Sequence, residues 1–369
     1  MESSRSMQLH EDPEPRGKRQ TLRARRARVT QSRRRILRAV VALTLWPWCS
    51  KADEATRPVD GDTAGQDRST AETPEPSTTQ QPASLADALR VRRQLLQREL
   101  GDRGFTVVEH SPFLVVGDEP QERVRQRAAG TVRWALRHLN RDYFRAAPER
   151  PVELWVLRDE ASYQRMARGR LGIRPSTPFG FYSPTQAAIM VNGATGAGTL
   201  VHEMVHALLA VDFPDSPAWF NEGFASMFEQ CEERQGTIWG LPNWRLRGLQ
   251  RALERRELPR LEQLCGLDTA AFYGAGDSLH YAQARYLCLY LQDRGVLRGY
   301  YARFRESQAD DPTGYATLRS VLGGIQPVEL ERDWAAYVAA LTPPEENNGP
   351  PAAPAIPGNR TPTPEEAGP

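Results

Sequence analysis

Lysine is nearly missing from this chain of 369 residues, which contains only Lys18 and Lys51. The four cysteines show no Cys-x-x-Cys spacing, so a cysteine zinc site is not expected. There is no internal repeat, no heptad run and no glycine loop with the lysine of a phosphate-binding loop. The apolar stretch Ile36 to Trp48 is too short to span a bilayer comfortably. These absences argue against a coiled coil, a P-loop nucleotide site and an ordinary membrane span.

Positive charge is concentrated at the start of the chain. Residues 1–38 contain 12 Arg and Lys against 4 Asp and Glu, a balance of +8, whereas the rest contains 36 against 42, or −6. A nucleic-acid-binding protein carries its basic patch on the folded region. We therefore expect no nucleic-acid partner.

The basic start has the layout of an export signal, because it precedes a short apolar stretch and the small-residue site Ser50-Lys51-Ala52. The segment Ser32 to Arg38 resembles the twin-arginine consensus of bacteria, and an ordinary secretory signal fits equally well. Lipidation at Cys49 is disfavoured, because Trp46 and Trp48 stand where a lipidation motif has small or aliphatic residues. We expect export from a bacterial cytoplasm, with membrane contact only through an uncleaved leader or a lipid on Cys49.

Composition divides the chain into four segments. Residues 1–52 form the leader, 53–84 a Pro/Ser/Thr-rich linker, 85–342 the folded domain and 343–369 a Pro-rich tail. The linker and the tail lack apolar periodicity and cannot bury enough surface to offset chain entropy, so we expect both to be disordered. The domain is long enough for a sizeable core.

The domain is predicted to have an α+β fold, in which a small mixed or antiparallel sheet is followed by a mostly helical C-terminal lobe. The expected helices are 84–100, about 120–145, a short one after 159, 199–211, 217–231, 242–256, 278–294, 297–308 and 327–341; the expected strands are a hairpin in 105–117, a strand at 151–159 and a hairpin turning at 183–186. For Ala187–Asn192 two alternatives stay open. It is either an edge strand beside helix 199–211, available to pair with an extended peptide, or an ordinary core strand.

Cleavage after Ala52 would leave three cysteines. A disulfide between Cys231 and Cys265 is open after export, and Cys288, within an apolar run, is predicted to be a buried thiol. An odd number of cysteines defines no disulfide framework.

The segment "TLVHEMVHALL", Thr199–Leu209, is a helical run with almost no polar residues except two histidines and a glutamate. His202 and His206 are four residues apart, so on a helix they share one face within about 5–6 Å. Two such imidazoles can bind one zinc, and Glu203 can then reach a water on the metal, a pattern typical of zinc metallopeptidases. The alternative is a pair of histidines satisfied in the core.

A catalytic zinc needs a third protein ligand, and "SPAWFNEGFASMFE" supplies a candidate. Ser216 suits the N-cap and Pro217 the first position of a second helix. Glu222 then falls on its second turn and can project toward the two histidines. The alternative is a surface carboxylate paired with an arginine.

The motif His202-Glu203-x-x-His206, followed by Trp219-Phe220-Asn221-Glu222-Gly223-Phe224-Ala225, resembles the gluzincin clan of zinc metallopeptidases. The overall pattern, with the later segment "HYAQARYLCLYL", also resembles bacterial peptidase MA-like proteins. The resemblance implies one zinc per chain held by His202, His206 and Glu222, with Glu203 as general base. It also implies an oxyanion donor from a later helix, for which Tyr281 and His280 are candidates; for Tyr281 the alternative is a core aromatic.

One departure bears on specificity. Aminopeptidases of this clan use a carboxylate to hold the free amine of the substrate, and the corresponding strand Ala187–Asn192 has none. We therefore expect an endopeptidase acting on peptides or proteins. The alternatives are an inactive zinc-bearing binding or scaffold module, and a hydrolase of a non-peptide cell-wall amide. Glu203 argues against the inactive module, because a structural zinc site needs no base and usually closes with four protein ligands.

Overall fold

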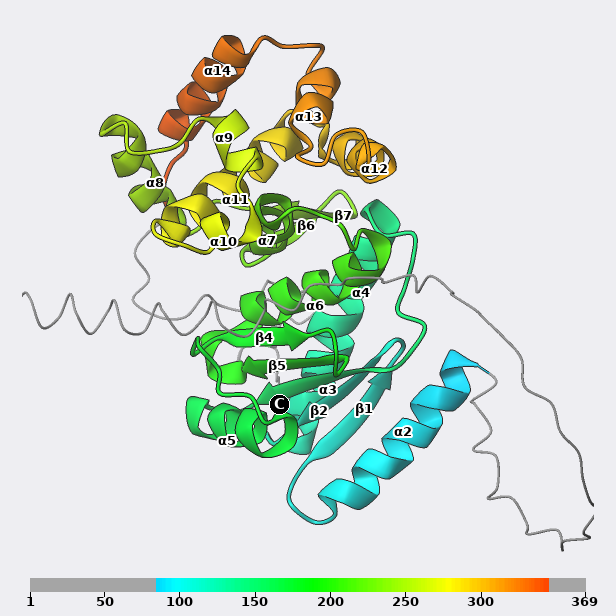
Figure 1. Cartoon of the computed structure of the whole chain (residues 1–369). Coiled ribbons are helices and arrows are strands. Elements are labelled where there is room, and N and C mark those ends of the chain that lie inside the picture. The colour runs from blue at the N-terminus through cyan, green and yellow to red at the C-terminus, as the bar shows by residue number, and fades with distance from the viewer. Residues whose placement is uncertain (1–83, 345–369) are drawn as a thin grey trace, which may run out of the picture. The chain divides into compact units, whose positions relative to one another are not determined.

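The computed structural model describes residues 84–344, and a five-stranded mixed sheet forms the N-terminal part of this region (Figure 1). The strands are β1 (Thr106–His110), β2 (Phe113–Gly117), β3 (Val152–Leu157), β4 (Gly180–Ser183) and β5 (Ala188–Asn192), in the spatial order β1-β2-β3-β5-β4. β2, β3 and β5 run parallel, and β1 and β4 pair antiparallel at the two edges. Both predicted hairpins are confirmed.

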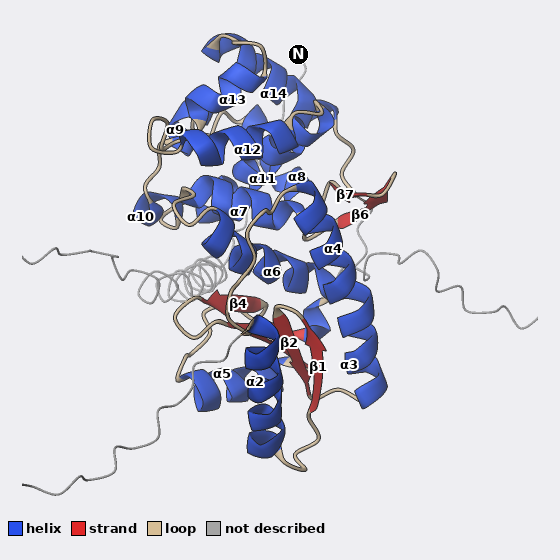
Figure 2. Ribbon diagram, turned by 90° about the vertical axis from the view of Figure 1, so that its right-hand side faces the viewer, coloured by secondary structure: helices blue, strands red, loops and turns tan. Residues whose placement is uncertain are grey.

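Alternate residues of the strands enter separate cores on the two faces of the sheet. One face packs against α2 (Leu85–Leu100) and α5 (Glu160–Leu171); the other packs against α3 (Gln121–Arg127), the π-helical turn Ala128–Val132, α4 (Arg133–Asp142) and α6 (Ala197–Asp212) (Figure 2). In β2, Leu114 enters the first core and Val115 the second. Because helices cover both faces, β2 and β5 are buried along their whole length, and all their residues except Asn192 are apolar or glycine.

The edge-strand alternative for Ala187–Asn192 is wrong. β5 is paired on both sides, parallel with β3 and antiparallel with β4, so it is a core strand. The edge strand beside α6 is β4. A Cβ atom at Gly180 of β4 would lie 3.1 Å from Thr199 Cγ2 of α6, so glycine permits this close approach.

The C-terminal part is mostly helical, as predicted. It contains α7 (Ala218–Met227), α8 (Arg245–Glu254), α9 (Leu261–Cys265), α10 (Thr269–Phe272), α11 (Asp277–Asp293), α12 (Leu297–Ser307), α13 (Tyr315–Val321) and α14 (Pro327–Ala340). The short helices α9, α10 and α13 are not predicted by the sequence pattern. The buried helix α11 packs closely on α7, where a Cβ at Gly223 would lie 2.7 Å from the Ala284 carbonyl group.

The predicted helix 217–231 is too long. α7 ends at Met227, and a hairpin of β6 (Cys231–Arg234) and β7 (Thr237–Gly240) follows it. Its turn, Gln235-Gly236, has positive φ at both residues, the conformation that suits a two-residue hairpin turn. The polar segment before this turn carries little strand signal, which explains the error.

Contacts distant in sequence hold this hairpin. Trp134 Nε1 donates to Glu233 Oε2 at 3.2 Å, and His138 Nδ1 donates to the Gly236 carbonyl at 2.9 Å. Both partners come from α4, almost 100 residues earlier. Local sequence therefore gave no indication of these contacts.

Cys231, Cys265 and Cys288 are buried free thiols. The Cys231–Cys265 disulfide is therefore not formed, and Cys288 is buried as predicted. Burial raises the pKa of the Cys231 thiol to about 12, so it stays protonated near neutral pH.

The predicted leader, linker and tail fall outside the described residues, apart from positions 84, 343 and 344. Described helices and strands run from Leu85 to Ala340. None of these helices combines the length and the apolar character needed to cross a bilayer.

Asp212 anchors the C-terminal end of α6. Its buried carboxylate accepts the backbone N–H groups of Arg145 and Ala146 at 2.8 and 2.7 Å. It also accepts the Tyr301 hydroxyl at 2.7 Å and Arg305 Nη1 at 2.8 Å. Burial by itself would raise the pKa of Asp212, but these four donors lower it below its ordinary value.

We expect Asp212→Asn to lower the free energy of unfolding by about 3 kcal/mol at neutral pH. Arg305 then loses its negatively charged partner, and an NH2 group, which cannot accept a hydrogen bond, replaces one carboxylate oxygen. The pKa of Asp212 is lower in the folded state than in the unfolded state. The ionised carboxylate therefore contributes its full stabilisation of the folded state above the unfolded-state pKa of about 3.9. This stabilisation is lost as the pH falls through the folded-state pKa. Urea unfolding of both proteins across this range checks the prediction. A stability difference that stays constant below about pH 4 would contradict it.

Candidate metal centre

His202 and His206 lie on one face of α6, one turn apart. Their ring centroids are 4.6 Å apart and their Nε2 atoms 2.9 Å apart. The neighbouring apolar side chains of the helix are buried: Leu200, Val201, Met204, Val205, Ala207, Leu208 and Leu209. α6 is therefore a core helix, as predicted, and the two imidazoles keep only 12% and 15% of their side-chain surface exposed.

The second helix begins one residue later than predicted. Pro217 occupies the N-cap position, and its carbonyl accepts the N–H groups of Phe220 and Asn221. The Ser216 hydroxyl does not cap the helix but accepts Asn221 Nδ2 at 2.9 Å. Glu222 still falls on the second turn of α7, facing α6.

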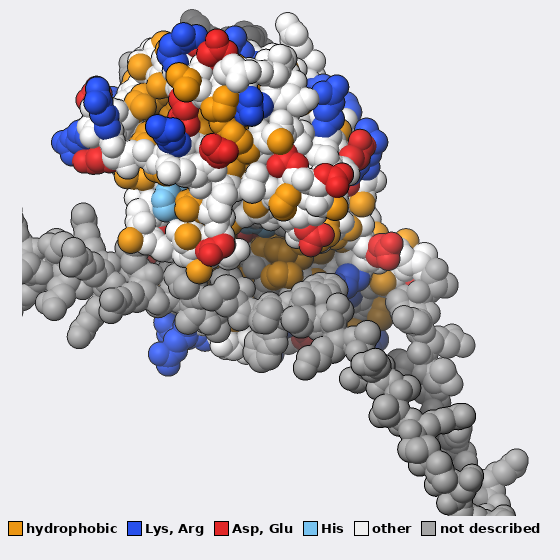
Figure 3. Space-filling view, turned by 45° about the horizontal axis from the view of Figure 1, so that its top comes forward, with side chains coloured by type: hydrophobic (Ala, Val, Ile, Leu, Met, Phe, Trp, Pro, Cys, Tyr) orange, Lys and Arg blue, Asp and Glu red, His pale blue; other side chains and the backbone are white. Residues whose placement is uncertain are grey.

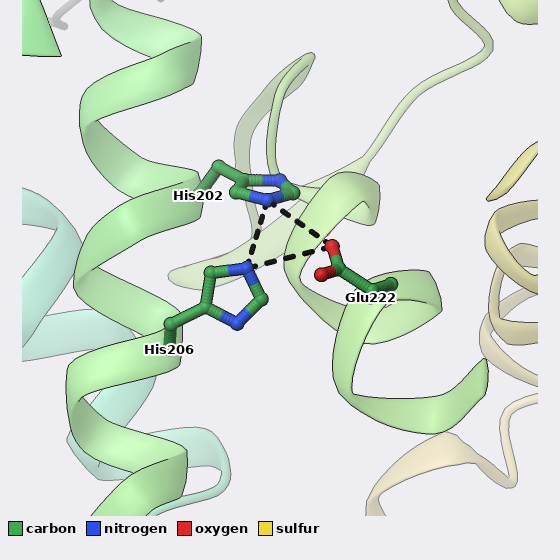
Figure 4. A group of neighbouring side chains, drawn as sticks. All are labelled: His202, His206 and Glu222. Atoms are coloured by element: carbon green, nitrogen blue, oxygen red, sulfur yellow. Dashed lines mark hydrogen bonds and ion pairs between the residues drawn. The ribbon is translucent and has the colours of Figure 1, made fainter. Parts of the chain in front are cut away.

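Glu222 completes a triangle of ligand atoms with the two histidines (Figure 4). Its Oε2 atom lies 3.5 Å from Nε2 of His202 and 3.5 Å from Nε2 of His206. A tetrahedral zinc with bonds of about 2.0–2.1 Å separates its ligand atoms by about 3.3 Å, close to these separations. Glu222 Oε2 is buried and accepts no hydrogen bond from the described residues. Two imidazole nitrogens and one carboxylate oxygen suit zinc, so the residues fit this ion.

Asn221 orients the second histidine. His206 Nδ1 donates to Asn221 Oδ1 at 2.6 Å, while the Asn221 amide is itself fixed by its bond to Ser216. A proton held on Nδ1 leaves the Nε2 lone pair facing the centre. The sequence named Asn221 as part of a motif without assigning it this role.

Glu229 lies beside the first histidine but is not hydrogen-bonded to it. Its Oε1 lies 3.6 Å from His202 Nδ1. Arg245 Nη2 donates to the same oxygen at 2.9 Å, and Asn243 Nδ2 donates to the other at 3.0 Å. Sequence reasoning missed Glu229, which lies beyond the end of α7 at Met227.

The centre is electrostatically suited to a cation. Burial would lower the pKa of His206, but the Glu222 carboxylate and the bond to Asn221 raise it to about 9. Burial would likewise raise the pKa of Glu222, yet the two histidines hold it well below its usual value. Glu229, whose pKa burial would raise, is kept ionised by Arg245 and His202. Negative charge thus surrounds the imidazoles from two directions.

Glu203 differs from the other two carboxylates. It is buried on α6 next to His202 but is not a member of the group of ligand atoms. Burial raises the pKa of Glu203, and the positive charge of the histidines only partly opposes this. A carboxyl group with a raised pKa, held outside the ligand set, is equipped to accept and release a proton.

Of the two later candidates, the structure brings only Tyr281 to Glu222. Burial and the charge of Glu222 raise the pKa of Tyr281 well above its ordinary value. The His280 ring instead packs on Phe272, and its Nδ1 donates to the Phe272 carbonyl at 2.9 Å. Sequence reasoning missed Tyr273, whose hydroxyl donates to Glu222 Oε1 at 2.5 Å, and no local pattern singles it out.

Figure 3 shows a hollow lined by hydrophobic side chains, below charged side chains of both signs on the C-terminal helices. Both imidazoles of the centre retain exposed surface. Both histidine side chains are therefore partly accessible to solvent, while Glu222 Oε2 is buried.

No protein-family model and no curated protein matches this chain. The chemistry available to the centre thus follows from its own residues. Two imidazoles and one carboxylate oxygen that accepts no hydrogen bond from the described residues can hold a divalent cation, and a second carboxyl group beside them can move a proton.

Proposed function

We propose that this protein is an exported, zinc-dependent metallopeptidase of the gluzincin type, with one zinc per chain held by His202, His206 and Glu222. One observation carries the proposal. The buried Glu222 Oε2 atom lies 3.5 Å from both Nε2 atoms and accepts no hydrogen bond from residues 84–344. Such a buried oxygen is costly unless something pairs with it, and a cation shared with both imidazoles would do so.

Glu203 is the proposed general base. Bound zinc would supply a Lewis acid for the scissile carbonyl and for the attacking water. Glu203 accepts the proton of this water and then donates it to the leaving amine. Asn221 orients the imidazole of His206 throughout, and the Glu229 carboxylate lies 3.6 Å from Nδ1 of His202.

Tyr281 is the proposed hydrogen-bond donor to the developing oxyanion, because it lies beside Glu222. His280 is the weaker candidate, since its Nδ1 proton is already given to Phe272. The substrate is an extended peptide, which can pair with the edge strand β4 beside α6. Endopeptidase activity is favoured because β5, Ala188–Asn192, offers no carboxylate for a free amine.

The test compares zinc-loaded and chelator-treated protein on a mixed peptide library, with products read by mass spectrometry and metal content measured on the same samples. We expect about one zinc per chain and internal cuts that stop on chelation and return with zinc. Stepwise N-terminal trimming would indicate an aminopeptidase. Bound zinc without cleavage would favour a cell-wall amide or an inactive module, and no zinc after supplementation would overturn the proposal. Mass spectrometry of the N-terminus of the exported protein shows whether the leader has been cleaved.

A further inference from the structure

The two carboxylate oxygens of Glu222 have different surroundings. Oε1 accepts the hydroxyl of Tyr273 at 2.5 Å. Within the described part of the chain, Oε2 accepts no hydrogen bond, and it faces both histidine Nε2 atoms at 3.5 Å. One oxygen is thus taken by a phenol, while the other is directed at the imidazoles.

Tyr273 is itself held in place. It follows α10, and its ring contacts Phe272 edge to face at a centroid distance of 5.4 Å. The ring of Tyr281 also lies near it, at a centroid distance of 6.1 Å. Because packing fixes the phenol, its hydroxyl limits the rotation of the Glu222 carboxylate.

We propose that Tyr273 is a positioning residue that makes Glu222 present a single oxygen, Oε2, to the metal. This inference rests on the proposed zinc site. A carboxylate can bind a metal through one oxygen or through both, and a strong hydrogen bond to Oε1 favours the first mode. Using one oxygen leaves a coordination position for water or substrate, which a catalytic zinc site requires.

The test compares Tyr273→Phe with Tyr301→Phe. Tyr301 is a matched control, because its hydroxyl also donates to a carboxylate, that of Asp212, at 2.7 Å. We expect Tyr273→Phe to bind zinc about 10–100-fold more weakly in competition with a chelator. After Co²⁺ substitution it should also show weaker d–d absorption, as expected when both oxygens of Glu222 bind. Tyr301→Phe should match the wild type in zinc affinity and in spectrum.

Folding is checked in the same experiment. Tyr273→Phe keeps the ring that contacts Phe272, so the metal-free variant should melt near the wild-type temperature, with a smaller stabilisation by added zinc. Unchanged zinc affinity and Co²⁺ spectrum would overturn the inference, and so would equal losses in both variants. These readouts need no peptide cleavage. A wild type that binds zinc without cleaving peptides would overturn the proposed function alone, whereas one that binds no zinc would overturn both.

Discussion

Glu203→Gln is expected to slow peptide cleavage by about 10²–10⁴-fold while the zinc content stays at the wild-type value. The amide has the size of the carboxyl group but cannot accept the proton of the attacking water. Zinc should be retained because Glu203 is not among the ligand atoms that face one another. Initial rates on one library peptide, together with elemental analysis of the purified proteins, check both parts.

Glu331→Gln is the matched control for this substitution. Glu331, on α14, also has a pKa raised by burial and accepts the Leu261 N–H at 2.6 Å, but it belongs to no part of the metal centre. Its variant should cleave at the wild-type rate. A Glu203→Gln protein that also cleaves at the wild-type rate would exclude Glu203 as the base. If Glu203→Gln lost both its cleavage rate and its zinc, the result would instead indicate that Glu203 helps to hold the metal.

Glu222→Gln is expected to weaken zinc binding by at least about 100-fold, more than loss of a residue that only orients a ligand. The substitution removes the negative charge that faces both imidazoles and keeps the volume of the side chain. Cleavage should fall in proportion to the zinc lost. Chelator competition measures the affinity, and excess zinc should restore part of the rate.

Glu331→Gln again serves as the control and should bind zinc like the wild type. If Glu222→Gln also retained wild-type zinc affinity, Glu222 would not be the third ligand. Tyr273 and Tyr281, which lie at the same carboxylate, would then have no metal-related role through it.

Short-range patterns predicted much of the fold. β-Branched and apolar runs identified β1 to β3, and helical spacing identified α2, α6 and α11 within a few residues. These elements depend on residues that are neighbours along one strand or one helix. The β6–β7 hairpin escaped prediction because its anchors, Trp134 and His138, lie almost 100 residues upstream.

For the candidate site, too, short-range patterns predicted some features and not others. Four-residue spacing put His202 and His206 on one face of a helix, and the motif around Glu222 indicated a second helix facing it. The residues that surround these groups did not follow from spacing. Glu229 is secured by residues beyond a hairpin, and Tyr273 comes from a segment 51 residues after Glu222.

By itself, then, the sequence determined the α+β class, the core helix α6 and the identity of the three candidate ligands, because each follows from periodicity within one element or from one short motif. Only the tertiary structure decided that the edge strand beside α6 is β4 and not β5, and which oxygen of Glu222 faces the histidines. It also decided that Tyr281 and not His280 lies at that carboxylate. These outcomes depend on the packing of segments that are distant in sequence, and no local pattern specifies it.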